Sequence, residues 1–380
     1  MIPPLDLLAA TEELREDLEA VYSRFLTSGR YVLGPEVNAF ETEYANYCRA
    51  DFCVGVGSGL DALHLSLKTA DVGPDDEVIV ASNTYIATWL AVTHAGGTVV
   101  PVEPDPSTHN IDPAQIREKI SGNTKAILAT NLYGLPVDYD AVRTIADDAD
   151  LAFLVDNAQA HGAKYKHRVV GGIADLECHS FYPSKNLGAL GEGGAVTTSN
   201  SEFADRIRLL RNYGSRERYH HEVPGFNSRL DELQAGILRV KLRRLNQWND
   251  RRRAIAAVYE ERFSRHPDIV QAFEPDWATS AWHLYVVRVP ERDQVMRSMA
   301  EVGIGCLIHY PIPPHRSAAY QATSFSQPFP IADSLADSVL SLPMGPHLAV
   351  KDAEKVADTL IQAVENARRL TADEPETRAA

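Results

Sequence analysis

The chain has 380 residues, 44% of them hydrophobic and 23% charged, which is typical of a soluble globular protein. Its formal net charge of −15 argues against binding a polyanion through bulk electrostatics, so we expect no nucleic-acid partner. We expect no membrane span either, because no apolar run approaches the roughly 20 residues that cross a bilayer. Four cysteines without zinc-type spacing or a signal peptide predict a cytoplasmic protein with reduced thiols and no metal site.

The first two thirds of the chain predict alternating strands and helices. Leu14, Leu18, Val21 and Phe25 fall on one helical face and indicate an amphipathic opening helix. Helix-length segments such as 61–70 and 139–149 separate five short apolar runs, which predict buried strands at 52–56, 78–81, 99–102, 126–129 and 151–155. This alternation predicts an α/β fold with a parallel or mostly parallel sheet covered by helices.

The last third changes character after a long helical pattern over about 230–263. The run 282–289 alternates weakly and predicts a strand of a smaller α+β unit. We place the boundary near Trp248, with a large domain at 1–248, a small domain at 249–370 and a disordered, apolar-poor tail at 371–380. The basic clusters at 241–244 and 251–253 alternate with apolar residues at helical spacing, which favours a solvated helix face over a recognition patch.

A loop around Lys185 carries the most chemical information. Residues 180–188 read SFYPSKNLG, so one lysine stands in a hydroxyl-rich loop between apolar segments. Partial desolvation would lower the pKa of its amine and make it a nucleophile toward a carbonyl, for which pyridoxal phosphate is the natural cofactor. From this motif alone, a solvated loop lysine without function stays open.

A glycine-rich turn at 55–63 leads from a predicted strand into a predicted helix. Backbone N–H groups and the helix dipole at such a junction bind anions, and Ser58 adds a hydroxyl donor. A dinucleotide site is the rival interpretation, but the third glycine is missing and no acidic residue closes the strand at 78–80. We therefore favour a phosphate site over a nicotinamide site.

Two other strand ends supply groups suited to a pyridine ring. Asp156 follows the strand 151–155 and can keep a ring nitrogen protonated, whereas Gln159 can donate to a ring phenolate. Tyr85 follows the strand 78–81 and can stack on a flat heteroaromatic ring. A helix cap would also explain Asp156, and a core position would also explain Tyr85. Together with the lysine loop, these residues point to one pyridoxal-phosphate site.

Four segments resemble the DegT/DnrJ/EryC1/StrS family of nucleotide-sugar aminotransferases, which use pyridoxal phosphate. They are GSGLDAL at 57–63, VDNAQAHG at 155–162, SFYPSKNLG at 180–188 and GFNSRLDELQA at 225–235, and the likeness continues through 309–315 and 341–345. It implies the type I fold of aspartate aminotransferase and a homodimer with shared active sites.

The resemblance also implies a role for individual residues. Lys185 becomes the Schiff-base lysine and proton carrier, Asp156 the partner of the pyridinium and Gln159 the phenolate donor. Tyr85 becomes the stacking residue. The phosphate ligands would be Ser58, Gly59 and Ser180, joined by Asn227 from a second subunit.

The implied reaction moves an amino group from L-glutamate to a nucleotide-linked keto-deoxysugar. Leu60, where the 4-amino branch commonly has threonine, favours a thymidine-diphosphate 3-keto-6-deoxyhexose, and a 4-keto sugar is the alternative. The candidate sugar contacts are Tyr182, Tyr213, Tyr219, His309, Tyr310 and His315, with Arg216 or Arg218 for the diphosphate. An alternative function of another class is that of a non-catalytic regulator that binds the cofactor or the sugar. A sugar dehydratase of this fold would carry histidine in place of Lys185.

Overall fold

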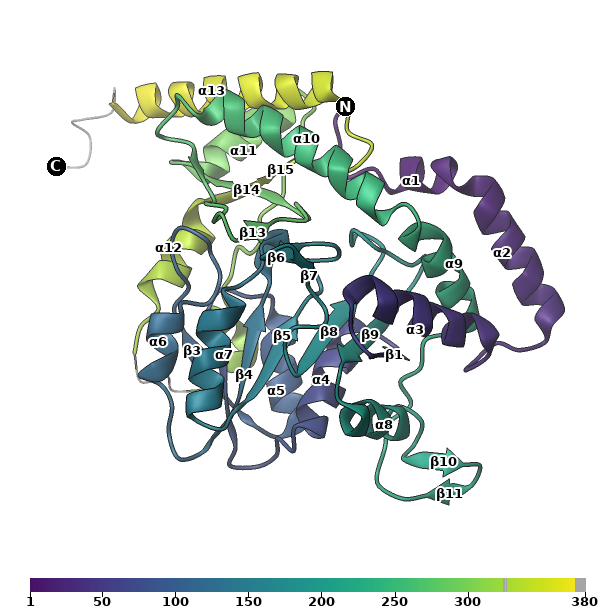
Figure 1. Ribbon diagram of the computed structural model, residues 1–380. Helices are drawn as coiled ribbons and strands as arrows, with labels where there is room; N and C mark the ends of the chain where they lie inside the picture. Colours follow the sequence, from purple (N-terminus) through teal and green to yellow (C-terminus); the bar gives the residue numbers. More distant parts are fainter. Residues whose placement is uncertain (324, 326, 373–380) are drawn as a thin grey trace.

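The computed structural model describes residues 1–323, 325 and 327–372. Its centre is a seven-stranded sheet in the order β1-β9-β8-β5-β4-β2-β3 (Figure 1). These strands are β1 (Phe52–Val56), β2 (Glu77–Ala81), β3 (Thr98–Val102), β4 (Thr124–Thr130), β5 (Ala152–Asp156), β8 (Leu176–Ser180) and β9 (Gly194–Thr198). Strand β9 is antiparallel to both of its neighbours, and the pairs from β8 to β3 are parallel. The prediction of a mostly parallel sheet is confirmed.

The central strands are buried on both faces, which explains their unbroken apolar sequences. Along β2, Val78 and Val80 belong to one hydrophobic cluster, whereas Ile79 and Ala81 belong to another on the opposite face. Successive side chains of a strand point to opposite faces, so a sheet covered on both sides needs apolar residues at every position. The five apolar runs predicted as strands all lie in this sheet.

Helices cover both faces of the sheet. The cluster on one face includes residues of α4 (Gly59–Thr69), α5 (Ile86–Ala95) and α8 (Ser201–Leu210). The cluster on the other face includes residues of α6 (Pro113–Arg117) and α7 (Tyr139–Asp148), and a further cluster joins α3 (Pro35–Cys48) to α9 (Glu232–Leu242). The helices predicted at 61–70 and 139–149 are therefore confirmed as α4 and α7.

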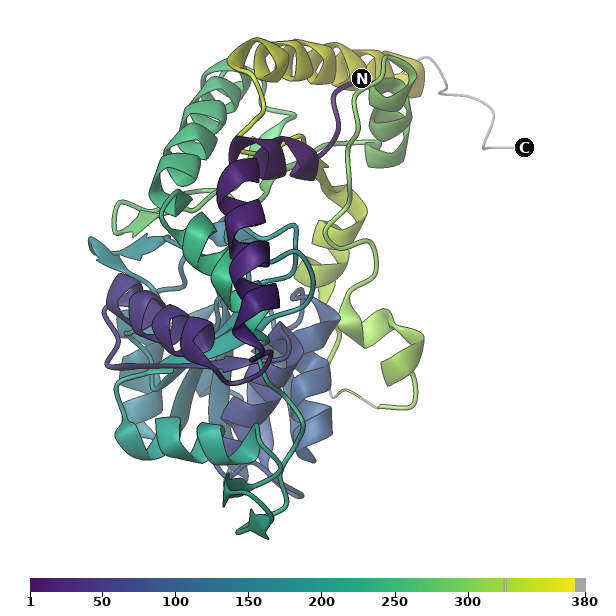
Figure 2. The same cartoon turned by 90° about the vertical axis from the view of Figure 1, so that its right-hand side faces the viewer.

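The N-terminal segment forms α1 (Leu7–Glu13) and α2 (Arg15–Ser28), which run down one side of the molecule (Figure 2). Leu14, Leu18 and Val21 pack against Ile237 and Val240 of α9. These are the residues whose spacing predicts the opening helix.

The C-terminal part has a hydrophobic core of its own, formed around α10 (Leu245–Phe263), α11 (Arg292–Glu301) and α13 (Val350–Ala372). Its three-stranded sheet has the order β12-β14-β15, with β12 (Val270–Gln271), β14 (Tyr285–Arg288) and β15 (Val339–Leu342). The smaller elements are α12 (Pro330–Ser338), β6 (Lys164–Tyr165), β7 (Arg168–Val169), β10 (Ser215–Glu217), β11 (His220–His221), β13 (Ala278–Thr279), and the 3-10 turns Leu132–Gly134, Pro314–Arg316 and Ala318–Tyr320. The domain boundary at residue 248 stays a prediction.

Two expectations for this region are wrong. The helical pattern over 230–263 forms two helices that turn at Arg243–Arg244, because α9 packs on α2 and α3 whereas α10 packs on α13 (Figure 1). The basic clusters do not form a fully solvated helix face, because the side chains of Lys241 and Arg252 are buried, with 5% and 3% of their surface exposed. Helix α13 also includes residues 371 and 372, and the rest of the predicted tail lies outside the described residues.

Candidate active site

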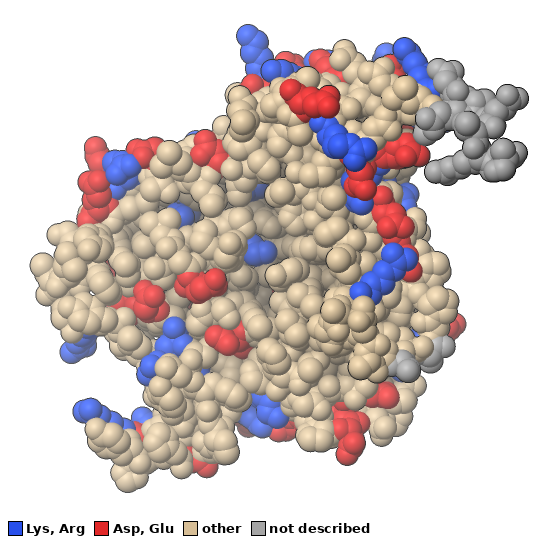
Figure 3. All heavy atoms as spheres, turned by 180° about the vertical axis from the view of Figure 1, so that it is seen from behind, with Lys and Arg blue, Asp and Glu red and all other residues tan. Residues whose placement is uncertain are grey.

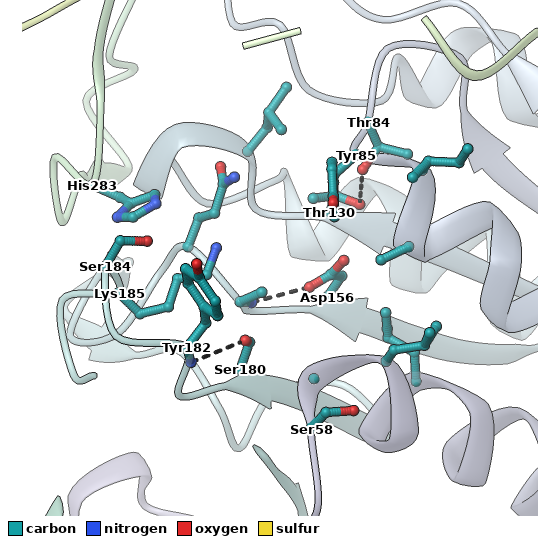
Figure 4. A pocket seen from close by; sticks show the side chains of 18 of the residues that line it. Ser58, Thr84, Tyr85, Thr130, Asp156, Ser180, Tyr182, Ser184, Lys185 and His283 are labelled. Carbon is teal, nitrogen blue, oxygen red and sulfur yellow. Dashed lines mark hydrogen bonds between the residues drawn. The ribbon is translucent and has the colours of Figure 1, made fainter. Parts of the chain in front are cut away.

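A cavity of about 480 Å³ lies at the carboxyl ends of the parallel strands. Its lining includes the last residues of β4, β5 and β8, which are Thr130, Asp156 and Ser180, and the start of α4. Figure 3 shows the hollowed face, and Figure 4 shows the side chains around the cavity. Open α/β sheets bind ligands at this edge.

The loop after β8 holds Lys185 in the cavity. Fully buried Phe181 anchors the loop, because its N–H donates to the carbonyl of Gly193 at 2.8 Å and its carbonyl accepts from Ala189 N at 2.8 Å. The N–H of Lys185 donates to Tyr182 O at 2.9 Å, which turns the lysine inward. Burial lowers the pKa of Lys185 to about 8, and the charge of Asp156 opposes this shift. The pKa of Lys185 is therefore lowered, as the sequence of the loop predicts.

Asp156 is a buried carboxylate with two hydrogen-bond donors. Its Oδ1 accepts from Ala158 N at 3.0 Å, and its Oδ2 accepts from Thr88 Oγ1 at 3.0 Å. Burial raises the pKa of Asp156, opposed by these two donors and by Lys185. Within the part of the chain that the structure describes, Asp156 forms no salt bridge, so the cavity holds an acceptor suited to a cationic ring nitrogen.

A chain of threonines lies behind Asp156, whose Oδ2 accepts from Thr88 Oγ1. Thr84 Oγ1 lies 3.0 Å from Thr88 Oγ1 and 3.1 Å from Thr130 Oγ1, and all three side chains are buried. Thr84 and Thr88 are one helical turn apart after β2, but Thr130 comes from another strand. The sequence carries no signal that joins them to Asp156.

The start of α4 forms the opposite end of the cavity. Ser58 caps the helix, since its Oγ accepts from Asp61 N at 3.1 Å, while Gly59 lies against Ser180. A Cβ atom built on Gly59 would stand 2.5 Å from Ser180 Cβ, so only glycine permits this approach. The two serine hydroxyls and the helix N-terminus together suit a phosphate group.

Residues from the C-terminal part close the cavity. Gln159 Nε2 donates to Tyr310 OH at 2.9 Å, and the rings of Tyr310 and Tyr85 lie 5.1 Å apart. His309 Nδ1 lies 2.8 Å from Ser341 Oγ, and burial, followed by the charge of Lys185, lowers the pKa of His309 to about 4. This histidine is therefore neutral at neutral pH.

The cavity brings together ten of the predicted site residues: Ser58, Gly59, Tyr85, Asp156, Gln159, Ser180, Tyr182, Lys185, His309 and Tyr310. Ser184, Glu192 and His283 also line it, and the sequence analysis did not select them. Their neighbours in sequence give no signal of an inward orientation.

Six predicted candidates do not line the cavity of this single chain: Tyr213, Arg216, Arg218, Tyr219, Asn227 and His315. Asn227 forms an isolated bridge with Asn212, and the exposed ring of Tyr219 lies beneath Arg218. His315 pairs with Asp333 at 2.9 Å. His315 thus has a structural partner in the same chain, whereas Asn227 and Tyr219 face outward.

A mostly parallel sheet with a half-buried lysine, a strand-end carboxylate and a helix N-terminus around one cavity defines a pyridoxal-phosphate enzyme of the aminotransferase fold. The model of the DegT/DnrJ/EryC1/StrS aminotransferase family matches residues 12–361, and the chain belongs to this family.

Several characterised relatives are similar over nearly the whole chain. "Erythromycin biosynthesis sensory transduction protein EryC1" of Saccharopolyspora erythraea is 52% identical, covering 94% of this chain and 98% of the relative. The "dTDP-3-amino-3,4,6-trideoxy-alpha-D-glucose transaminase" of Streptomyces venezuelae is 48% identical, covering 94% and 95%. The "dTDP-3-amino-3,6-dideoxy-alpha-D-galactopyranose transaminase" of Aneurinibacillus thermoaerophilus is 47% identical, covering 95% and 99%.

Solved structures agree with this relationship. DesV of S. venezuelae, in complex with a ketimine intermediate, superposes with a TM-score of 0.94 at 48% identity, covering 96% of this chain and 98% of DesV. The PLP form of Spr1654 of Streptococcus pneumoniae has a TM-score of 0.89 at 26% identity, covering 92% of this chain and 96% of Spr1654. Pyridoxal phosphate is therefore the cofactor of this protein, as the sequence predicts.

Proposed function

We propose that this protein transfers the amino group of L-glutamate to C3 of a thymidine-diphosphate-linked keto-deoxysugar. The observation that carries the proposal is the half-buried Lys185, with a pKa of about 8, beside the buried carboxylate of Asp156 in one cavity. The names of the S. venezuelae and A. thermoaerophilus relatives, both dTDP-3-amino sugar transaminases, support the choice of C3.

The cavity fits pyridoxal phosphate at both of its ends. We assign the phosphate to Ser58, Gly59 and Ser180, because hydroxyls and free helix N–H groups meet there without a Cβ in the way. The pyridine nitrogen would face Asp156, a carboxylate that forms no salt bridge with a described residue. Tyr85 and Gln159 would contact the ring from the other side of the cavity. When bound, the cofactor supplies an aldehyde and an electron sink.

The protein's own side chains supply the nucleophilic amine and the group that carries the proton. Since its pKa is about 8, a useful fraction of Lys185 carries a free lone pair near neutral pH, and its Nζ can take and return a proton. Asp156, supported by Thr88 and Ala158, holds a negative charge where a protonated ring is needed. Neutral His309, together with Tyr182 and Tyr310, offers polar contacts for the sugar in the same cavity.

We further propose a cytoplasmic homodimer in which Asn227 of the partner subunit completes the phosphate site. Asn227 is exposed and does not line the cavity of its own chain, which supports this arrangement. Tyr213 and Tyr219 are also outward-facing and stay candidates for the sugar pocket. All four cysteines are buried free thiols, in keeping with a reducing compartment, and no helix among the described residues is long and apolar enough to span a bilayer.

Lys185→Ala tests the proposal directly. We expect a folded protein that loses turnover by at least about 10⁴-fold, because no other amine replaces the nucleophile and proton carrier. The measurement combines circular dichroism with an assay that follows glutamate consumption and product formation. Lys125→Ala, at an exposed lysine, is the matched control and should keep full activity. Turnover by Lys185→Ala at the wild-type rate would refute the assignment.

The same assay separates the alternatives. A panel of 3-keto and 4-keto nucleotide sugars, with the product analysed by NMR, shows which carbon receives nitrogen, and amination at C4 would refute the C3 proposal. The name of the S. erythraea relative includes sensory transduction, which keeps a regulator as the second candidate. A regulator would bind the cofactor or the sugar but would not convert glutamate to 2-oxoglutarate.

A further inference from the structure

A second, smaller cavity lies on the other side of the lysine loop. It has a volume of about 80 Å³, and its walls come from residues 5–11, residues 183–190 and the helices α9 and α10. Lys185 lines both this cavity and the larger one, so the loop that carries it forms the wall between them. No role in the proposed reaction uses the smaller cavity.

Two buried cations line this cavity. Lys241 Nζ donates to Gly188 O at 2.7 Å, and Arg252 Nη1 donates to the carbonyls of Trp282 and His283, each at 3.1 Å. The side chains are 5% and 3% exposed. Within residues 1–323, 325 and 327–372, neither cation forms a salt bridge with a carboxylate, and Arg252 Nε lacks a hydrogen-bond partner.

Asp6 is the acidic residue in the lining, and it does not neutralise these charges. It is exposed, forms no salt bridge with a described residue, and uses its Oδ1 to accept from Ala9 N at 3.0 Å as the N-cap of α1. Burial lowers the pKa of Lys241 to about 8 and that of Arg252 to about 9, so both are mostly charged near neutral pH. Burying a cation without a carboxylate partner is unfavourable, and the carbonyl dipoles offset this cost only in part.

We propose that the small cavity binds one monovalent anion of the size of chloride, between Lys241 and Arg252. The two positive charges select an anion, and the volume excludes a nucleotide or a sugar. Because Lys185 borders the same cavity, the bound anion would also stabilise the charged form of the reactive amine from the side opposite the active-site cavity.

Crystals of the cofactor-loaded protein soaked in bromide provide the first test. We expect an anomalous peak inside the cavity, within about 3.5 Å of nitrogen atoms of both cations. A cavity without a peak would overturn the proposal. So would a carboxylate from a second copy of the chain between Lys241 and Arg252, since that carboxylate would neutralise them instead.

Thermal unfolding in solution provides the second test. Replacing bulky isethionate by chloride at constant ionic strength should raise the melting temperature of the wild-type holoenzyme, on the order of 2–4 °C at saturation. Lys241→Met and Arg252→Met should each lose this rise, whereas Arg243→Met, at an exposed arginine on the same segment, should keep it. If Arg252→Met does not fold, the melting temperature of Lys241→Met and the anomalous peak in the bromide-soaked crystal test the proposal. Equal rises in wild type and Lys241→Met would overturn the proposal.

Discussion

Asp156 shows how the role proposed for a single residue brings a cost in stability. Burial raises its pKa, so in the cofactor-free protein the ionised carboxylate is less favourable than it is in water. Two hydrogen bonds, from Ala158 N and Thr88 Oγ1, limit this cost. Among the described residues Asp156 forms no salt bridge, so the carboxylate stays available to a cationic ring nitrogen.

Asp156→Asn should separate these two effects. We expect turnover to fall by on the order of 100-fold or more, and the cofactor-free protein to become more stable at neutral pH. The folded protein binds the Asp156 proton more tightly than the unfolded chain does, so ionisation above the raised pKa destabilises the fold, and the neutral amide avoids this. The gain should shrink as the pH falls through the raised pKa and vanish below the ordinary value of 3.8.

The measurement is thermal unfolding of cofactor-free wild type and variant from neutral to acidic pH. Asp276→Asn, at an exposed aspartate, is the control and should change stability little at any pH. A variant less stable than wild type at neutral pH would contradict the role assigned to burial.

At the scale of elements, the start of α4 depends on one close approach. Ser58 occupies the N-cap position, and Gly59 begins the helix against the end of β8. This contact places the helix N-terminus and the hydroxyl of Ser180 at the same end of the cavity. A side chain at residue 59 would push the two elements apart.

Gly59→Ala should therefore weaken cofactor binding while leaving the fold intact. The added Cβ would lie 2.5 Å from Ser180 Cβ, and relieving such a clash costs about 1–3 kcal/mol, or about 5- to 150-fold in affinity for pyridoxal phosphate. Titration of the cofactor-free protein, followed by absorbance, gives the affinity. Gly122→Ala is the matched control, because a Cβ there meets no atom within 4 Å. Equal affinities of the two variants would show that the close approach has no role in binding.

At the scale of the whole molecule, the cavity depends on two hydrophobic cores. Strand β5 of the first core ends in Asp156, the loop after β8 holds Lys185, and the C-terminal part supplies His309 and Tyr310. Gln159 Nε2 and Tyr310 OH join the two parts by a hydrogen bond of 2.9 Å. The hairpin β10–β11 projects away from both parts (Figure 1).

Mixed dimers test whether active sites are shared between subunits. Lys185→Ala and Asn227→Ala should each be nearly inactive alone, but equal amounts dissociated and reassembled together should regain about a quarter of the wild-type activity. Half of the dimers are then mixed, and one of the two sites in each mixed dimer carries neither substitution. Lys185→Ala mixed with Asp156→Asn is the control, because every site keeps one defect and activity should not return. Failure of the first mixture to regain activity would argue against a shared site.

The sequence by itself determined the sheet, the cofactor and the lysine proposed to bind it. Strands buried on both faces need apolar residues at every position, so they are recognisable from short runs. Asp156 ends a strand, and Ser58 and Lys185 stand in the turns that follow strands, so the strand ends fix which edge of the sheet these residues reach. These patterns depend on residues within a few positions of one another, so they can be recognised before the fold is known.

Only the tertiary structure decided which residues far apart in the sequence come into contact. Thr88 donates to a carboxylate 68 positions away, and His283 reaches the cavity from the C-terminal part. The break between α9 and α10 and the burial of Lys241 and Arg252 follow from packing against α2, α3 and α13. Hydrogen bonds and burial depend on which elements become neighbours, and a local pattern of residues does not encode that.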